Sequence, residues 1–200
     1  MSLDALLKQI RTCTLCAETL EHGVRPVIQA STTATILVAG QAPGAKVHAS
    51  GLPFDDPSGD RLRQWMGIDH KTFYDPAAVA LLPMAFCYPG RGKSGDLPPM
   101  PLCASTWRKH LLAAVPRIRL TLVIGQYAHQ WHLPRREKTL TETVKRWSSY
   151  PPDLLPLPHP SPRNNIWLAK NHWFQKDLVP VIRKRVKQAL KSKLSDHHGE

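Results

Sequence analysis

The chain has no long hydrophobic run and no segment typical of a secretory signal. Nowhere in its 200 residues is there a stretch approaching the ~20 consecutive apolar residues of a membrane-spanning helix. The first residues, MSLDALLKQIRTC, lack the long apolar core and cleavage site of a signal peptide. We therefore predict a cytoplasmic protein without a membrane partner. The length suits one globular domain, expected over residues 1–200 and as a monomer.

Acidic residues are scarce relative to basic ones. The sequence contains 27 Lys and Arg against 15 Asp and Glu, a formal net charge of +12. Such an excess favours a polyanionic partner, because phosphates bind Lys and Arg and release counterions. The alternative is a basic surface that contacts only solvent. Much of the excess lies in RKRVKQALKSK (183–193), within a basic amphipathic helix that we predict over about 174–194, interrupted or started by Pro180.

Cysteine is also scarce, but the four cysteines are not scattered at random. Cys13 and Cys16 form a CxxC pair, and Cys87 and Cys103 are separated by fifteen residues. Disulfides are rare in the cytoplasm, whereas four thiolates suit tetrahedral zinc or an iron–sulfur cluster. Zinc sites more often use two close pairs, so the long second spacing favours a cluster. Four unrelated buried thiols remain the alternative to any shared site.

Short apolar runs alternate with segments of helical periodicity. Runs rich in apolar residues predict four strands, at 35–39, 78–84, 120–125 and 154–157. Amphipathic spacing predicts further helices, at 4–10, 58–66, 107–115 and 126–131. Ser58 is expected to be the N-cap of the helix that it begins. The alternation predicts an α/β fold, a three-layer α/β/α arrangement around a central, mainly parallel four-stranded sheet.

Polar motifs follow the predicted strands. In such sheets ligands bind beyond the carboxyl ends of the strands. Four segments fall at such ends, namely GQAPG (40–44), the loop after Pro83, GQYAH (125–129) and HPSPRNN (159–165). We expect these segments to converge on one site.

Four motifs, in this order, resemble those of the uracil-DNA glycosylase superfamily. They are the cysteine layout, GQAPG after a strand, GLPF at 51–54 and the late HPSPRN at 159–164. The resemblance is closest to family 4, the iron–sulfur-containing branch, and extends from about Leu6 to Leu190. It implies a uracil-DNA glycosylase-like fold. It also implies an enzyme that hydrolyses the N-glycosidic bond of uracil, or of another deaminated base, in DNA during base excision repair.

The resemblance further implies roles for individual residues. The four cysteines match the ligands of a [4Fe-4S] cluster, which are here Cys13, Cys16, Cys87 and Cys103. Phe54 matches the aromatic residue that stacks on the flipped base. His159 matches the histidine that contacts the uracil carbonyl as negative charge develops there. We assign substrate binding to seven residues: Gly40, Ala42, Phe54, Ser58, Ser161, Arg163 and Asn164.

The sequence departs from the family pattern in three segments. Gln41 replaces the family's Glu, Val47 and His48 occupy the segment that is usually acidic, and Pro83 lies near the usual uracil-reading Asn. A neutral imidazole can accept a proton near pH 7. We therefore predict that His48 holds or activates the water.

The sequence leaves the roles of several residues open. Gln41 is placed with the catalytic residues and binds through its side chain or its backbone. Ser161 and Arg163 are expected to grip phosphates, while Asn164 either reads the base or shapes a turn. The residues that can orient His48 or act in its place are Asp55, Asp56 and Asp60. The alternatives to an enzyme are a catalytically altered iron–sulfur DNA-binding module of the same fold and, less favoured, an RNA-binding metal protein.

Overall fold

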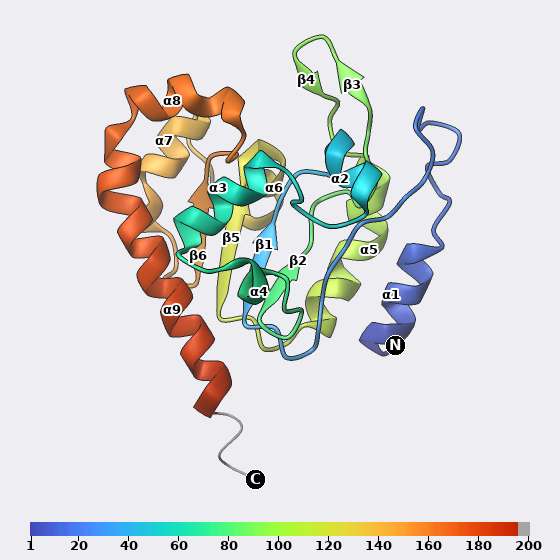
Figure 1. Cartoon of the computed structure of the whole chain (residues 1–200), viewed down its shortest axis with the longest axis horizontal. Helices are drawn as coiled ribbons and strands as arrows, with labels where there is room; N and C mark the ends of the chain where they lie inside the picture. The colour runs from blue at the N-terminus through green and yellow to red at the C-terminus, as the bar shows by residue number, and fades with distance from the viewer. Residues whose placement is uncertain (196–200) are drawn as a thin grey trace.

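A parallel sheet of four strands forms the centre of the molecule in the computed structural model, which describes residues 1–195 and the side chains through Lys191 (Figure 1). The strands follow the order β2-β1-β5-β6, and all three pairings are parallel. They are β1 (Ile36–Ala39), β2 (Val79–Leu81), β5 (Leu120–Ile124) and β6 (Leu154–Leu157). A separate two-stranded hairpin consists of β3 (Arg91–Gly92) and β4 (Gly95–Asp96).

Helices cover both faces of the sheet. They are α1 (Leu3–Arg11), α2 (Ala45–Ser50), α3 (Pro57–Met66), α4 (His70–Phe73), α5 (Pro101–Ala114), α6 (Gly125–His132), α7 (Leu140–Lys145), α8 (Asn165–Lys170) and α9 (Val179–Ser195). Shorter helical turns are η1 (Trp147–Ser149), η2 (Pro162–Asn164) and the π-helical η3 (Phe174–Leu178). Among residues 1–195, no helix combines the length and the apolar character that crossing a bilayer would require. The predicted three-layer α/β/α fold is confirmed.

Successive side chains of the strands enter two different cores. Ile36 and Val38 of β1 pack with residues of α3 and α9, whereas Leu37 between them packs with residues of α1 and α5. Successive residues of a strand point to opposite faces, so a strand covered on both sides is apolar throughout. This explains why the TILVA run shows no polar alternation.

The basic C-terminal helix is confirmed, with η3 as its first turns. One face is buried by Phe174, Leu178, Ile182 and Val186, while Lys184 and Lys187 are exposed. Pro180 is the second residue of α9 and directly follows η3, so the change from π-helix to α-helix falls at the proline. Residues 196–200 of the predicted domain lie outside the described residues.

Two helix boundaries differ from the prediction. Ser58 does not cap α3; the Asp56 side chain is the N-cap and accepts from the Gly59 N–H at 2.9 Å. Pro57 follows at the first helical position, so the helix begins one residue before Ser58. Helix α5 begins at Pro101 rather than at Trp107, because proline is tolerated in the first turn of a helix. Cys103 therefore lies on this helix.

A buried and a half-buried histidine, both on α6, brace the sheet and the segment that follows β2. His129 of α6 is 1% exposed, and its Nε2 lies 3.0 Å from both the Val123 and the Leu157 carbonyl oxygens. It thereby joins the ends of β5 and β6. His132, one turn later, lies beside Arg108 of α5. Burial lowers the pKa of His129 to about 4 and that of His132 to about 3, with the positive charge of Arg108 a second cause for His132.

We expect the stability of the fold to decrease on mild acidification. In the unfolded chain both histidines titrate near the ordinary value of about 6.5. Below that pH the unfolded state binds protons that the folded state does not, so the free energy of unfolding falls as pH drops from about 6.5 toward about 4. Urea denaturation at pH 7.5 and 5.5 measures this. In His132→Gln, whose amide oxygen can still accept from Arg108, the pH dependence should be shallower; an identical slope would contradict the assignment.

Candidate functional site

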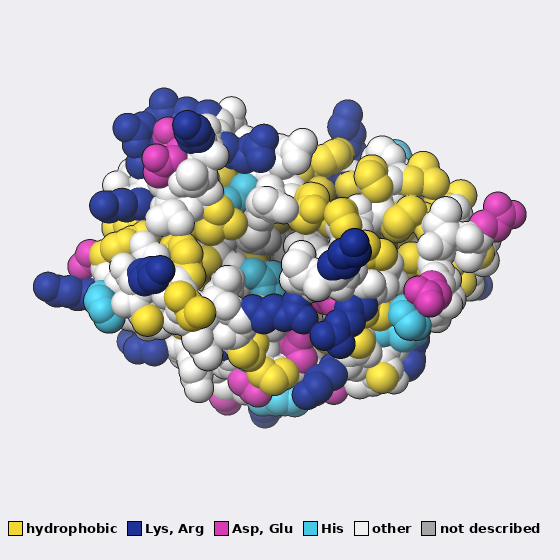
Figure 2. Space-filling model, turned by 90° about the horizontal axis from the view of Figure 1, so that it is seen from above, with side chains coloured by type: hydrophobic (Ala, Val, Ile, Leu, Met, Phe, Trp, Pro, Cys, Tyr) yellow, Lys and Arg dark blue, Asp and Glu magenta, His cyan; other side chains and the backbone are white. Residues whose placement is uncertain are grey.

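A pocket of about 490 Å³ opens at the carboxyl edge of the sheet. Its walls come from residues within the segments 40–47 after β1, 53–58 at the start of α3 and 159–164 after β6, together with Val27, Pro83 and Asp96. Seen from above, Lys and Arg side chains border the hollow, and a histidine is visible inside it (Figure 2). The segment 125–129 is not part of the lining, because Gly125 begins α6 directly and His129 is turned into the core. Three of the four predicted segments therefore converge.

The GQAPG turn is held against the segment that follows β2. The carbonyls of Gly40 and Gln41 accept from the N–H groups of Met84 and Ala85, at 2.9 and 3.1 Å. The Gln41 side chain donates to the carbonyl of Leu97, beyond the β3–β4 hairpin, at 3.4 Å. Gly40, Gln41 and Ala42 all line the pocket, as predicted for the substrate side of this turn.

Phe54 reaches the pocket from a strained backbone position. Its φ of 56° is the one positive value among the non-glycine residues that the structure describes. Its ring lies edge-on to Phe73, with centroids 6.1 Å apart, and packs over Gly40, where a Cβ would come within 3.3 Å of Cζ. The first turn of α3 fits under the Phe54 carbonyl because Gly59 has no Cβ. Such strain is kept only where the surrounding structure enforces it. The half-buried ring lines the pocket and offers it a surface for stacking.

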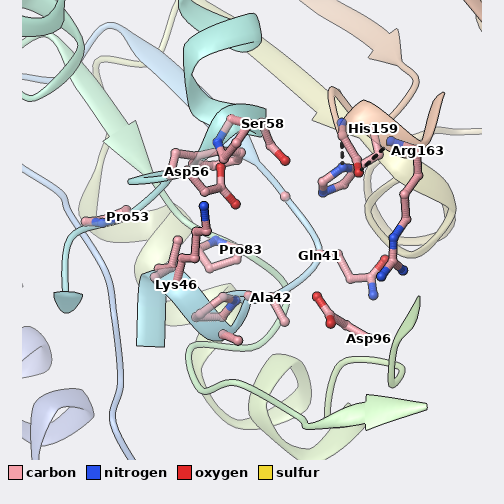
Figure 3. A pocket seen from close by; sticks show the side chains of 18 of the residues that line it. Gln41, Ala42, Lys46, Pro53, Asp56, Ser58, Pro83, Asp96, His159 and Arg163 are labelled. Atoms are coloured by element: carbon pink, nitrogen blue, oxygen red, sulfur yellow. Dashed lines mark hydrogen bonds between the residues drawn. The ribbon is translucent and has the colours of Figure 1, made fainter. Parts of the chain in front are cut away.

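His159 is fixed in one tautomer. Its Nδ1 accepts the N–H of Ser161 at 3.2 Å, so the proton of the neutral ring resides on Nε2. Burial lowers the pKa of His159, while the carboxylates of Asp56 and Asp96 act in the opposite direction. Its carbonyl accepts from Nδ2 of Asn164 at 2.7 Å (Figure 3), which shows that Asn164 shapes this turn. The pocket thus receives a neutral imidazole with an N–H to donate.

The loop around His159 is braced from two sides. Arg61 of α3 donates to the Ser161 carbonyl at 2.9 Å and to Oδ1 of Asn165 at 2.7 Å. The Ser161 hydroxyl accepts from the N–H of Arg163 and so caps η2. The exposed guanidinium of Arg163 contacts the Ser94 carbonyl at 3.4 Å, a long bond that a phosphate could replace.

His48 lies outside the pocket. It is on α2, where its ring packs beside Tyr88 and His22 at centroid distances of 5.9 and 6.5 Å. Its Nδ1 is buried without a hydrogen-bond partner among the described residues. Lys46 and Val47 line the pocket instead, because each further residue of a helix is turned by about 100°. This position does not support the water-activating role predicted for His48.

Asp56 is the acidic residue of the GLPFDD segment that reaches the pocket. Its Oδ1 caps α3, and its Oδ2 lies about 4.0 Å from where a Cβ on Gly44 would be. In Figure 3, Asp56 and His159 approach the pocket from opposite sides. Asp55 and Asp60 do not line it, and Asp60 instead pairs with Arg63. Ser58, buried in the first turn of α3, does line it.

Sequence reasoning missed two charged residues of the pocket. Lys46 comes directly from α2, and Asp96 from the β3–β4 hairpin, 52 residues after Gly44 in sequence but next to it in space. No local motif marks either residue. The one available signal was charge, because Lys46 is the charged residue of AKVHAS and Asp96 the acidic residue of GKSGD.

The four cysteines line a second, smaller cavity. It is enclosed by the end of α1 and the segment after it, by residues 85–87 and by the first turns of α5. All four are free thiols. Burial raises the pKa of Cys16 and Cys87, and that of Cys103 to about 12, with the other cysteines as a further cause.

Zinc and an iron–sulfur cluster require different arrangements of four thiols. Among residues 1–195, no three His, Cys, Asp or Glu side chains are arranged to hold a single metal ion. A single zinc needs all its ligands about 2.3 Å from one point. In a cluster each thiolate binds a different iron, so the sulfurs lie further apart. The four cysteines around this cavity supply the thiolate ligands that such a cluster takes.

The geometry defines an α/β protein with a ligand pocket at the carboxyl edge of a parallel sheet. Residues 28–183 match the family model described as Uracil DNA glycosylase superfamily. This segment includes the whole four-stranded sheet and every residue that lines the pocket except Val27. The chain belongs to the uracil DNA glycosylase superfamily. Membership supports a glycosylase-type hydrolase whose substrate is DNA.

Proposed function

We propose that this protein excises uracil, or another deaminated base, from DNA, and that it belongs to the iron–sulfur branch of the superfamily. The observation that carries this proposal is the neutral His159, held by Ser161 with its N–H free for the pocket, opposite the Asp56 carboxylate. A hydrogen-bond donor for the leaving base and an anion for the sugar are what hydrolysis of an N-glycosidic bond needs.

The base must first leave the helix. Its glycosidic bond is unreachable within a duplex, and flipping the nucleotide costs a few kcal/mol. The Phe54 ring lines the pocket where it can stack on the flipped base. Pro83 lines the pocket near the usual position of the family's uracil-reading Asn and cannot make its hydrogen bonds. The base is therefore read by other groups, among them Ser58 and the GQAPG backbone. Arg163 at the rim is suited to a flanking phosphate.

The chemical step separates charge between base and sugar. As the glycosidic bond breaks, the base becomes anionic and the sugar resembles an oxocarbenium ion. His159 donates through Nε2–H to a base oxygen and stabilises that anion in the way of an oxyanion-hole donor. The Asp56 carboxylate stabilises the sugar cation and orients a water for attack on its anomeric carbon. We assign Asp56 the role that the sequence suggested for His48.

The cysteine site serves this reaction from a distance. Cys13, Cys16, Cys87 and Cys103 would hold the [4Fe-4S] cluster, which supplies a covalent cross-link between three segments when bound. Cys87 and Cys103 bracket the segment that carries the β3–β4 hairpin. Fixing this segment positions Asp96 at the pocket and directs Arg91 and Lys93, both exposed, toward DNA.

The function is tested by excision from labelled oligonucleotides. Each carries uracil, hypoxanthine or xanthine, in single and double strands, and cleavage is scored after alkaline treatment. Cleavage at one of these lesions would establish glycosylase activity and identify the base that the protein excises. Cluster-loaded protein that binds these oligonucleotides but cuts none of them would instead support a DNA-binding module that has lost catalysis.

A matched pair of variants distinguishes Asp56 from His48 as the residue that orients the water. Asp56→Asn keeps the oxygen that caps α3 but removes the negative charge, so we expect the excision rate to fall by roughly 10²- to 10⁴-fold with little change in melting temperature. His48→Ala should keep at least half of the wild-type rate, because its ring is outside the pocket. Single-turnover excision measures both. The reverse pattern would return the water-activating role to His48.

A further inference from the structure

The largest of the fully buried side chains is that of a charged residue. Arg108 of α5 is 1% exposed. Burial lowers the pKa of its guanidinium to about 9, which still leaves it charged at neutral pH. Moving such a charge out of water costs several kcal/mol unless an opposite charge compensates for it. A buried arginine therefore calls for a partner.

The hydrogen-bond partners of Arg108 are all neutral. Nη1 donates to the carbonyls of Leu82 and Pro83, each at 2.9 Å, while Nε and Nη2 both donate to Nε2 of His132. His132 is uncharged, since burial keeps its pKa far below neutral pH. No carboxylate among residues 1–195 forms an ion pair with this guanidinium. The guanidinium of Arg108 therefore has hydrogen-bond partners but no opposite charge among them.

Arg108 shares helix α5 with one residue of the cysteine site. Cys103 is five residues earlier on the same helix, and a thiolate there would favour the charged guanidinium. Trp107, the neighbour of Arg108, lines the cysteine cavity itself. As four protonated thiols the site would carry no charge. Four thiolates around a cluster or a zinc ion carry net negative charge, because the ligands outweigh the metal.

We propose that Arg108 is the buried counter-charge of an anionic metal–thiolate centre held by Cys13, Cys16, Cys87 and Cys103. The same guanidinium grips the backbone of Leu82 and Pro83, and Pro83 lines the base pocket. Arg108 is thus a positioning residue that connects the cysteine site to the pocket. The inference rests on the proposed cysteine-held centre but not on the excision of any base.

The first test measures how firmly the metal is held, without DNA. Protein purified under nitrogen is analysed for iron, sulfide and zinc, and metal loss is then followed in the presence of a chelator. We expect Arg108→Met to lose metal at least tenfold faster than wild type. Arg108→Lys, which keeps the charge but not the planar fork, should remain within threefold. The control Lys109→Met removes an exposed charge from the adjacent position and should match wild type.

The second test uses thermal unfolding of a double-mutant cycle, so that it does not depend on metal release. Arg108→Met should lower the melting temperature of the wild-type protein. In the Cys103→Ser background the anionic centre is lost, so Arg108→Met removes a charge that has no compensating partner. There the same change should lower the melting temperature by less than half as much as in the wild-type background. Three outcomes would each overturn the proposal. They are an equal decrease in melting temperature in both backgrounds, an equal rate of metal loss in Arg108→Met and wild type, and a wild-type protein that contains neither iron nor zinc.

Discussion

Replacing His159 by alanine should reduce single-turnover excision by roughly 10²- to 10³-fold while the protein still binds DNA. Losing one donor aimed at a developing anion typically has an effect of this size. The Nδ1 of His159 is committed to the Ser161 N–H, so Nε2–H is the one ring donor left for a base oxygen. Because the ring is neutral in the folded protein, the effect comes from a hydrogen bond rather than from a full positive charge.

A matched control separates this role from a general effect of removing histidine. His172 is exposed and is not among the residues that line the pocket, so His172→Ala should excise at the wild-type rate. DNA binding by both variants is followed with fluorescently labelled oligonucleotide. An excision rate for His159→Ala within threefold of wild type would remove His159 from the mechanism. Loss of DNA binding in parallel with excision would indicate that the loop had collapsed.

Replacing Gly59 by alanine should destabilise the protein by about 3 kcal/mol or more and abolish excision. In an ordinary helix the change would be favourable, since alanine is preferred to glycine by about 1 kcal/mol. Here the added Cβ would overlap the carbonyl oxygen, the carbonyl carbon and the Cβ of Phe54. That overlap involves backbone atoms, which cannot rotate away as a side chain can. Relief requires α3 to shift or Phe54 to leave its strained conformation, and either change moves Asp56 and the stacking ring.

The control for Gly59 is a glycine where alanine meets no neighbour. Gly23 has a φ of 76°, and nothing lies within 4 Å of a Cβ there. Gly23→Ala should cost only the roughly 1–2 kcal/mol of a left-handed backbone conformation and should leave excision intact. Urea denaturation of both variants measures the difference. If Gly59→Ala were as stable as wild type, the contact between the start of α3 and Phe54 would not hold the pocket in place.

Much of the fold could be read from the sequence because its signals are local. Each predicted strand appears within two residues of its observed start, since a buried parallel strand is a short apolar run between turn residues. Helix ends were less predictable. Proline at 57 and 101 extended α3 and α5 toward their N-termini, and the capping of α3 by Asp56 instead of Ser58 depended on which side chain reached the Gly59 N–H.

The order of the motifs and the types of their residues were determined by the sequence alone. GQAPG, PF and the HPSPRN segment lie at the pocket as predicted, because parallel strands bring their carboxyl ends to one edge. The tertiary structure alone decided which charged groups face each other there. On α2, His48 is turned toward Tyr88 while Lys46, two residues earlier, lines the pocket, and the hairpin brings Asp96 beside Gly44. Helix rotation and long-range packing set these positions, just as they bury Arg108 beside carbonyls that are 25 and 26 residues away in the chain.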